Sequence, residues 1–148
     1  RLHNIYAGEL FVSGEDKDFL EAGAFFEASC QDTGRSLDEI REASCVAARA
    51  ARIGRDTGKF FKYALKAVAC EGCAEICCEL GRYFLEQGDL DEAIVWFYNG
   101  AYETESILNI HSSGDIPLAG LAKCYELAGN GKQAREYAAL AAAWKPEV

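Results

Sequence analysis

Four cysteines lie close together near the middle of the chain, and their type and spacing are the first feature that suggests chemistry. Cys70, Cys73, Cys77 and Cys78 are separated by two, three and no residues. A zinc site needs four thiolate or imidazole ligands in a tetrahedron, and the two histidines of the chain stand in distant segments. Cysteine is also a small residue that suits a core. We therefore expect packing here, with a metal or redox function as the weaker alternative.

The other polar residues form no catalytic motif. The sequence contains no nucleophile elbow, no phosphate-binding glycine loop and no carboxylate pair in a distinctive context. His111 stands in a segment of Ser and Gly, with no cysteine or carboxylate placed to orient it. Because a catalytic site needs a reactive group and residues that position it, we expect no enzymatic activity and no cofactor.

The net charge of −9 is unevenly distributed. Residues 1–73 carry 10 bases and 12 acids, which gives −2, whereas residues 74–148 carry 5 bases and 12 acids, which gives −7. Residues 41–66 alone hold seven bases against two acids. Solvated helix faces are the first explanation, and a patch for an acidic partner is the alternative. An acidic chain lacks the positive footprint that nucleic acid requires, so no nucleic-acid partner is expected.

The cysteine count and hydropathy indicate a compartment. Seven cysteines are an odd number, without the turn-rich spacing of a disulfide scaffold, and reduced thiols are typical of the cytoplasm. No apolar run is long enough to cross a bilayer, and no secretory signal precedes the domain. We expect a cytoplasmic protein without a membrane partner. The start at Arg1 and the lack of methionine favour a fragment of a longer chain.

Helical spacing and caps recur along the chain, and no segment alternates with the two-residue period of a strand. Ser36 and Glu39 form a capping box, which predicts a helix over about 37–53. Thr57 is the expected cap of the next helix, over about 58–70. These patterns predict an all-α protein.

The remaining boundaries divide the expected helices into pairs. Gly72 is predicted to interrupt the helical pattern, and Asp89 and Asp115 each begin a further helix. The first two pairs are degenerate helical hairpins at 1–35 and 36–72. The whole chain, 1–148, is expected to be a single domain of about seven to eight helices.

One stretch of sequence occurs twice, 41 residues apart. The first copy begins with Leu80 and Gly81, and the second with Leu121 and Ala122. Each copy continues with an aromatic residue, a glycine and an alanine, namely Phe84, Gly88 and Ala93, then Tyr125, Gly129 and Ala134; Phe97 completes the first copy and Pro146 the second. Such self-similarity is the signature of a stacked repeat.

Residues 74–107 and 115–148 resemble tetratricopeptide repeats, which are helix–turn–helix units of about 34 residues. The resemblance implies a right-handed stack of antiparallel helical hairpins, a TPR-like α-solenoid, in which Gly81 and Ala122 allow close helix crossings. The period of 41 leaves an insert at 108–114, which we interpret as a tolerated insertion or as a lip beside a groove.

By the same resemblance, the first helix of each hairpin lines a concave groove that binds a peptide or partner segment. Arg82 and Lys123 fall on equivalent positions, 41 residues apart; each is a candidate for a carboxylate or phosphate, and its competing local partners are nearby glutamates. The predicted groove residues are Glu75, Cys78, Arg82, Leu85, Glu86, Ile116, Ala119, Lys123, Glu126 and Leu127.

The first functional hypothesis is therefore a non-enzymatic module that binds a protein or peptide in this groove. The alternative is an accessory or regulatory domain of a larger protein, because segments 4–10 and 74–81 also resemble the repeat tails of bacterial glycosyltransferases. The exposed apolar ends of a stack are also compatible with a homodimer. Trp96 and Tyr98 are expected to pack on a neighbouring hairpin, with an exposed adhesive patch as the alternative.

Overall fold

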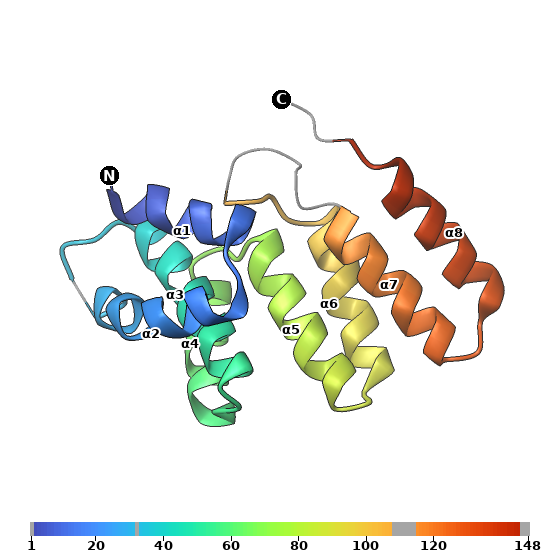
Figure 1. Ribbon diagram of the computed structural model, residues 1–148, viewed down its shortest axis with the longest axis horizontal. Helices are drawn as coiled ribbons and strands as arrows, with labels where there is room; N and C mark the ends of the chain where they lie inside the picture. The colour runs from blue at the N-terminus through green and yellow to red at the C-terminus, as the bar shows by residue number, and fades with distance from the viewer. Residues whose placement is uncertain (1, 32, 108–114, 146–148) are drawn as a thin grey trace. The chain divides into compact units, whose positions relative to one another are not determined.

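The computed structural model describes residues 2–31, 33–107 and 115–145, and every regular element among them is an α-helix (Figure 1). This confirms the predicted all-α class. The helices are α1 (Leu2–Ser13), α2 (Asp16–Ser29), α3 (Leu37–Ile53), α4 (Thr57–Ala69), α5 (Ala74–Glu86), α6 (Leu90–Tyr102), α7 (Asp115–Leu127) and α8 (Gly131–Ala143). None of these helices is long and apolar enough to cross a membrane.

Backbone contacts divide the chain into two compact units, Arg1–Gly72 and Cys73–Val148. The boundary follows the end of α4, where Glu71 and Gly72 both have positive φ, 75° and 69°. A left-handed pair of residues ends a helix, so the predicted interruption at Gly72 is confirmed. The single continuous stack, its right-handed sense and the single domain over 1–148 stay predictions.

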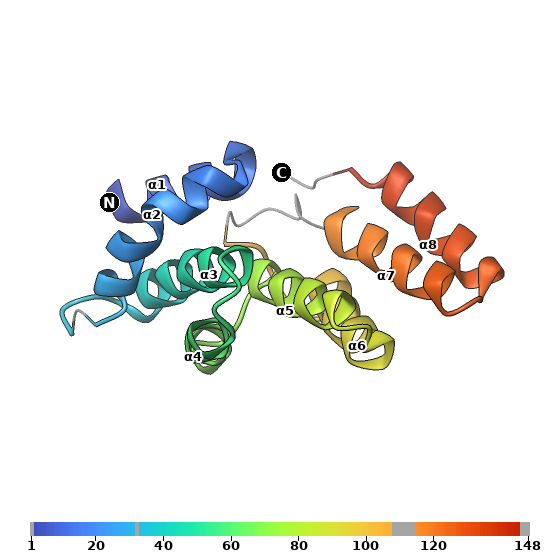
Figure 2. The same cartoon turned by 60° about the horizontal axis from the view of Figure 1, so that its bottom comes forward.

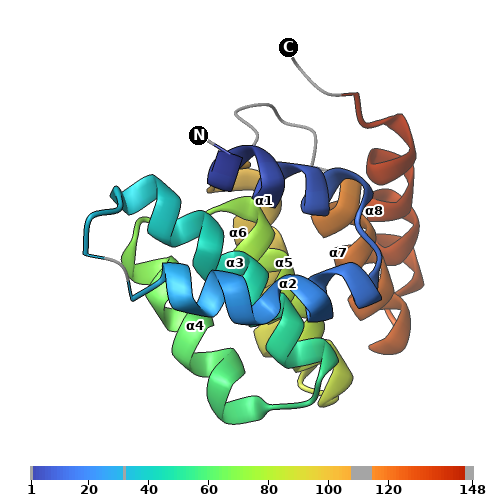
Figure 3. The same cartoon turned by 60° about the vertical axis from the view of Figure 1, so that its left-hand side comes forward.

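In the first unit, α3 packs against both α2 and α4 (Figure 3). Helix α1 also approaches α3, and the ring of Phe11 on α1 lies edge-to-face on that of Phe19 on α2, with centroids 5.1 Å apart. The degenerate hairpin expected over 1–35 stays a prediction. The largest buried side chains of this unit are aromatic, namely Phe19, Phe26 and Phe60.

The helix starts follow the polar residues that precede them. Ser36 Oγ accepts from the Glu39 backbone N–H at 3.2 Å, which confirms the predicted capping box. The cap of α4 is Asp56, whose Oδ1 accepts from the Lys59 N–H at 3.1 Å; the expected cap, Thr57, is the first helical residue instead. Both are good N-cap types, and the carboxylate one residue earlier takes the role.

In the second unit, α5 packs against α6, α6 against α7, and α7 against α8, while α5 also contacts α7 (Figure 2). The two hairpins turn at glycines as the repeated sequence predicts. Gly88 and Gly129 have φ of 79° and 82°, a backbone region that favours glycine. The core between the helices is built around Phe97, Leu118 and Leu121.

Glycines allow three close approaches in this unit. A Cβ on Gly81 of α5 would stand 2.8 Å from the Phe97 ring, and one on Gly120 of α7 would stand 2.5 Å from it. At Gly100 of α6, a Cβ would lie 3.2 Å from Cys77 Cβ and 3.4 Å from Pro117 Cβ. Small residues thus let α5, α6 and α7 approach one another closely.

Candidate functional site

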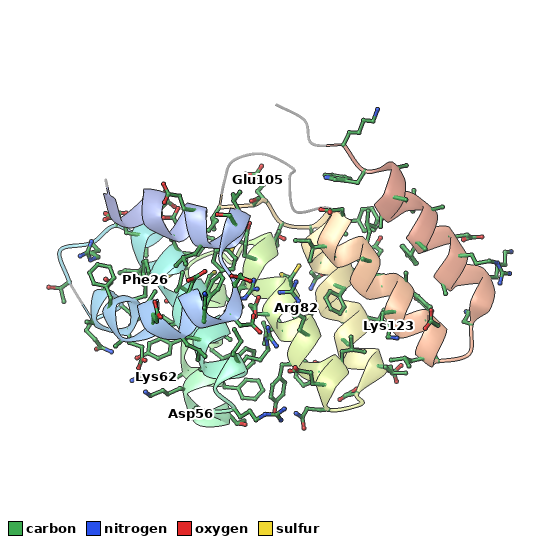
Figure 4. All side chains as sticks on the ribbon, viewed as in Figure 1. Phe26, Asp56, Lys62, Arg82, Glu105 and Lys123 are labelled. Carbon is green, nitrogen blue, oxygen red and sulfur yellow. The ribbon has the colours of Figure 1, made fainter. Side chains whose placement is uncertain are left out.

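The ten predicted groove residues lie on α5 and α7, which are neighbours in the second unit. Figure 4 shows Arg82 on the first of these helices and Lys123 on the second. Their exposure differs along the set. The exposed members are Glu86, Ile116, Ala119, Lys123, Glu126 and Leu127, the half-buried members are Arg82 and Leu85, and the buried members are Glu75 and Cys78.

Glu75 is committed to the fold. Its Oε2 accepts from Ser106 Oγ at 2.6 Å, and its Oε1 accepts from the Ile107 backbone N–H at 3.0 Å. The Ala74 N–H also donates to the Glu105 carbonyl at 2.8 Å. The Glu75 carboxylate therefore fastens the segment after α6 to the first turn of α5. Because Glu75 is only 5% exposed, the prediction that it lines an open groove is not supported.

Cys78 is also removed from the surface. It belongs to the same buried cluster as Phe97 and Leu121. Burial raises the pKa of the Cys78 thiol well above its usual value, although the neighbouring Arg82 charge acts in the opposite direction. A buried, protonated thiol is a packing group, so Cys78 contributes to the core rather than to ligand contact.

Arg82 has a buried partner. Its Nη1 donates to Glu79 Oε2 at 2.9 Å, and the two side chains are 31% and 1% exposed. A carboxylate so deeply buried is costly without a compensating charge. Arg82 therefore neutralises Glu79 from the rim of the core while part of its side chain still reaches solvent.

Lys123, the equivalent residue on α7, lies in a different environment. Its Nζ donates to Glu126 Oε1 at 3.4 Å, with the side chains 55% and 68% exposed. Exposed pairs of this kind contribute little and exchange readily with solvent. The glutamates expected to compete for both bases do bind them, but only the Lys123 pair is loose enough to open for a ligand at small cost.

The apolar members form the remaining surface. Ile116 is 41% exposed and Leu127 is 54% exposed, at opposite ends of α7. Leu85 packs partly against the core cluster. Large apolar side chains that face water on one helix are suited to contact with a partner.

The cysteines are positioned for packing. All seven are buried thiols outside any disulfide bond. Cys70 ends α4, whereas Cys73 precedes α5, so the four clustered cysteines do not share one helix. Burial raises the pKa of Cys77 to about 12, although a hydrogen bond from Thr104 opposes the shift. Among the described residues, no three His, Cys, Asp or Glu side chains are grouped as metal ligands.

The aromatic residues of α6 divide between core and surface. Phe97 is buried and Trp96 half-buried, but Tyr98 and Tyr102 are 43% and 50% exposed, with ring centroids 4.8 Å apart. Burial raises the pKa of Tyr137 on α8, in the following hairpin, and Tyr102 and Tyr98 add to this rise. Packing of Tyr98 on a neighbouring hairpin and an exposed aromatic patch both stay predictions. The predicted lip at 108–114, with His111, lies outside the described residues.

Sequence reasoning missed three contributors to this region. Gly120 has no counterpart in the repeated pattern, Ser106 lies in an irregular segment, and Glu79 was considered only as a surface partner of Arg82. The signals available for them were a glycine inside a predicted helix and a glutamate three residues before an arginine.

No protein-family model matches this chain, and a search of curated proteins likewise gives no match.

Proposed function

We propose that the second unit is a pair of tetratricopeptide-like repeats that binds a protein segment along α5 and α7. The observation that carries this proposal is the exposure of Ile116, Lys123 and Leu127 along one helix, α7, that also contacts α5. We name this surface the α5–α7 face, and it further includes Leu85, Glu86 and Ala119. The protein would act by binding, without catalysis.

The packing of the unit supports the repeat assignment. Each hairpin pairs with its neighbour through the first helices, α5 and α7, and through α6 with α7. The glycine at the close crossing, Gly81, faces the aromatic residue of the second helix, Phe97, as the repeated pattern requires. Stacked hairpins of this kind present one face of their first helices to a ligand.

The chemistry of the face suits a segment with apolar anchors and a carboxylate. Ile116 and Leu127 lie eleven residues apart on α7, which is about 16 Å along a helix axis. Lys123 lies between them and is held by an exposed ion pair with Glu126. An extended or helical segment with two apolar side chains and an intervening acid matches this pattern.

The test is capture of partners from cell extract on immobilised protein, followed by binding curves with the recovered segment. The variant Lys123→Glu, Leu127→Ser changes two exposed residues of the face. Arg82 is left intact because its replacement would disturb buried Glu79. Lys132→Glu, a change of another exposed lysine on α8, is the matched control.

We expect the double variant to lose partners that the wild type and the Lys132→Glu control both retain. Melting curves establish that all three proteins are folded. Recovery of the same partners by all three, with unchanged dissociation constants, would refute the assignment of the α5–α7 face.

A further inference from the structure

The second helices of two hairpins, α4 and α6, carry outward faces that the α5–α7 face does not use. On α4, buried Phe60, Tyr63 and Ala67 point inward, and the opposite side presents Lys62 and Leu65. Leu65 is 60% exposed. We name Lys62, Leu65, Lys66 and Ala69 the α4 outer face.

The α4 outer face is positively charged without local compensation. Helix α4 contains three lysines and no acid. Lys59 pairs with Glu27 at 3.3 Å, but Lys62 and Lys66 have no ion pair among the described residues. Lys62 Nζ does lie 5.3 Å from the centroid of the Tyr63 ring. The face therefore combines an exposed apolar centre with two positive charges that have no acidic partner among the described residues.

Helix α6 carries the opposite combination. Its buried residues are Ala93, Phe97 and Gly100, and its other side presents Asp91, Val95, Tyr98 and Tyr102, which we name the α6 outer face. Val95 is 51% exposed. Two acids and no base lie on this helix.

The stretch of sequence that contains α6 is acidic beyond the helix itself. Residues 83–122 contain seven acids and no lysine or arginine. All seven acids are exposed: Glu86, Asp89, Asp91, Glu92, Glu103, Glu105 and Asp115.

We infer that the α4 outer face of one molecule docks on the α6 outer face of a second copy of this chain. Leu65 meets Val95 and the tyrosine rings, while Lys62 and Lys66 meet Asp91 and its acidic neighbours. Lysine ammonium groups also bind favourably over tyrosine faces. Complementary charge fixes the register of the two helices, and the apolar centre supplies the affinity.

A second copy fits better than other occupants because the same chain supplies both halves of the contact. A net charge of −9 opposes approach to an anionic membrane or to nucleic acid. The two faces differ, so the interface is heterologous: each molecule can offer its α4 outer face to one neighbour and its α6 outer face to another. A contact of two helix faces is small, which predicts weak, salt-sensitive association.

Sedimentation equilibrium at about 100 μM protein, a concentration suited to a small interface, tests the inference. Lys62→Gln with Leu65→Gln removes the α4 outer face, and Val95→Gln with Tyr98→Gln removes the α6 outer face. All four positions are exposed, and circular dichroism checks each fold. Lys62→Glu with Lys66→Glu is the second α4 variant if the glutamine pair unfolds. Leu37→Gln, at a residue 61% exposed on α3, is the matched control.

We expect the wild type and the Leu37→Gln control to associate, and each double variant alone to bind itself at least about tenfold more weakly. An equimolar mixture of the two double variants regains association, because each keeps the face that the other lacks. Raising NaCl from about 0.05 M to about 0.5 M weakens the wild-type complex.

Three results would overturn the inference. The first is a wild type that stays monomeric in low salt. The second is association that the mixture fails to restore, because the two molecules would then use the same face. The third is a monomer whose α4 outer face binds vesicles of anionic phospholipid, which would assign that face to a membrane.

Discussion

The ring of Phe97 on α6 lies directly against the backbone of Gly81 on α5. A Cβ on Gly81 would stand 2.8 Å from Cδ1, Cε1 and Cζ of the ring, and a Cβ on Gly120 of α7 would meet the same three atoms at 2.5–2.7 Å. One edge of a single aromatic ring thus fills the space between two neighbouring helices. Since Phe97 is 2% exposed, the ring has little room to move away.

Gly81→Ala is expected to destabilise the protein by about 1–3 kcal/mol, because the added methyl group overpacks the Phe97 ring. The same change at Gly58, where a Cβ would meet only Asp56 Oδ1 at 3.8 Å, is expected to be neutral or to stabilise by about 0.4–1 kcal/mol. Chemical denaturation of both variants measures the difference. Equal effects at the two glycines would contradict the close approach at Gly81.

Trimming the ring should relieve the added methyl group. Phe97→Leu alone is expected to cost about 1–2 kcal/mol through lost burial and an incompletely filled space. Combined with Gly81→Ala, it should cost less than the sum of the two single changes, by about 0.5–3 kcal/mol. A double-mutant cycle from urea unfolding provides this coupling, and strict additivity would mean that the two sites do not touch.

Glu75→Gln is expected to loosen the segment after α6. The carboxylate accepts from Ser106 Oγ and from the Ile107 N–H, and an amide replaces one acceptor oxygen with a donor. We expect a loss of about 1–3 kcal/mol and faster amide hydrogen exchange at Ile107. Glu105→Gln is the control, since Glu105 contributes its carbonyl to Ala74 and its side chain is exposed. Unchanged exchange at Ile107 in the Glu75 variant would contradict the role of the Glu75 carboxylate in holding this segment on α5.

These contacts show what the sequence could predict about the fold. Asp89 caps α6, and its Oδ1 accepts from the Glu92 N–H at 3.2 Å. This cap, the Ser36 cap and the turns at Gly88 and Gly129 depend on residues within a few positions of one another, and each was predictable. The helical class followed from the same local signals. A glycine inside a predicted helix marks Gly120 as unusual, but the requirement comes from the Phe97 ring on another helix, which no local pattern identifies.

The candidate site was less predictable for a similar reason. Glu75 and Ile116 are equivalent in sequence, 41 residues apart, yet the first is 5% exposed and the second 41%. Glu75 is covered by Ser106 and Ile107, which precede α7 and pack back on α5. Exposure depends on such long-range packing, whereas sequence spacing assigns only the helix face.

The buried thiols predict a pH dependence of stability. Burial raises the pKa of Cys77 to about 12 and that of Cys124 to about 11, from a usual value of 9.0. The contribution of the two thiols to the free energy of unfolding is full below pH 9.0, where they are protonated in both the folded and the unfolded protein. It falls above pH 9.0, because the thiols of the unfolded chain ionise first. Wild-type stability should therefore decline more between pH 8.5 and 10.5 than that of Cys77→Ala with Cys124→Ala. Equal declines, measured by urea unfolding, would refute burial as a source of this pH dependence.

Arg82→Gln is expected to affect stability more than Lys123→Gln. Arg82 donates to a glutamate that is 1% exposed, whereas Lys123 pairs with a glutamate that is 68% exposed. Removing a hydrogen bond to a buried charge costs about 1.5–3 kcal/mol, and an exposed pair contributes at most about 1 kcal/mol.

A second change separates the ion pair from general packing. With Glu79→Gln already present, no buried charge requires Arg82, so Arg82→Gln should then cost less than it does alone. Thermal melting of the two single variants, the double variant and Lys123→Gln tests this order. If Lys123→Gln proved as destabilising as Arg82→Gln, the two bases would have equivalent structural roles, and the choice of Lys123 as the more available ligand contact would be wrong.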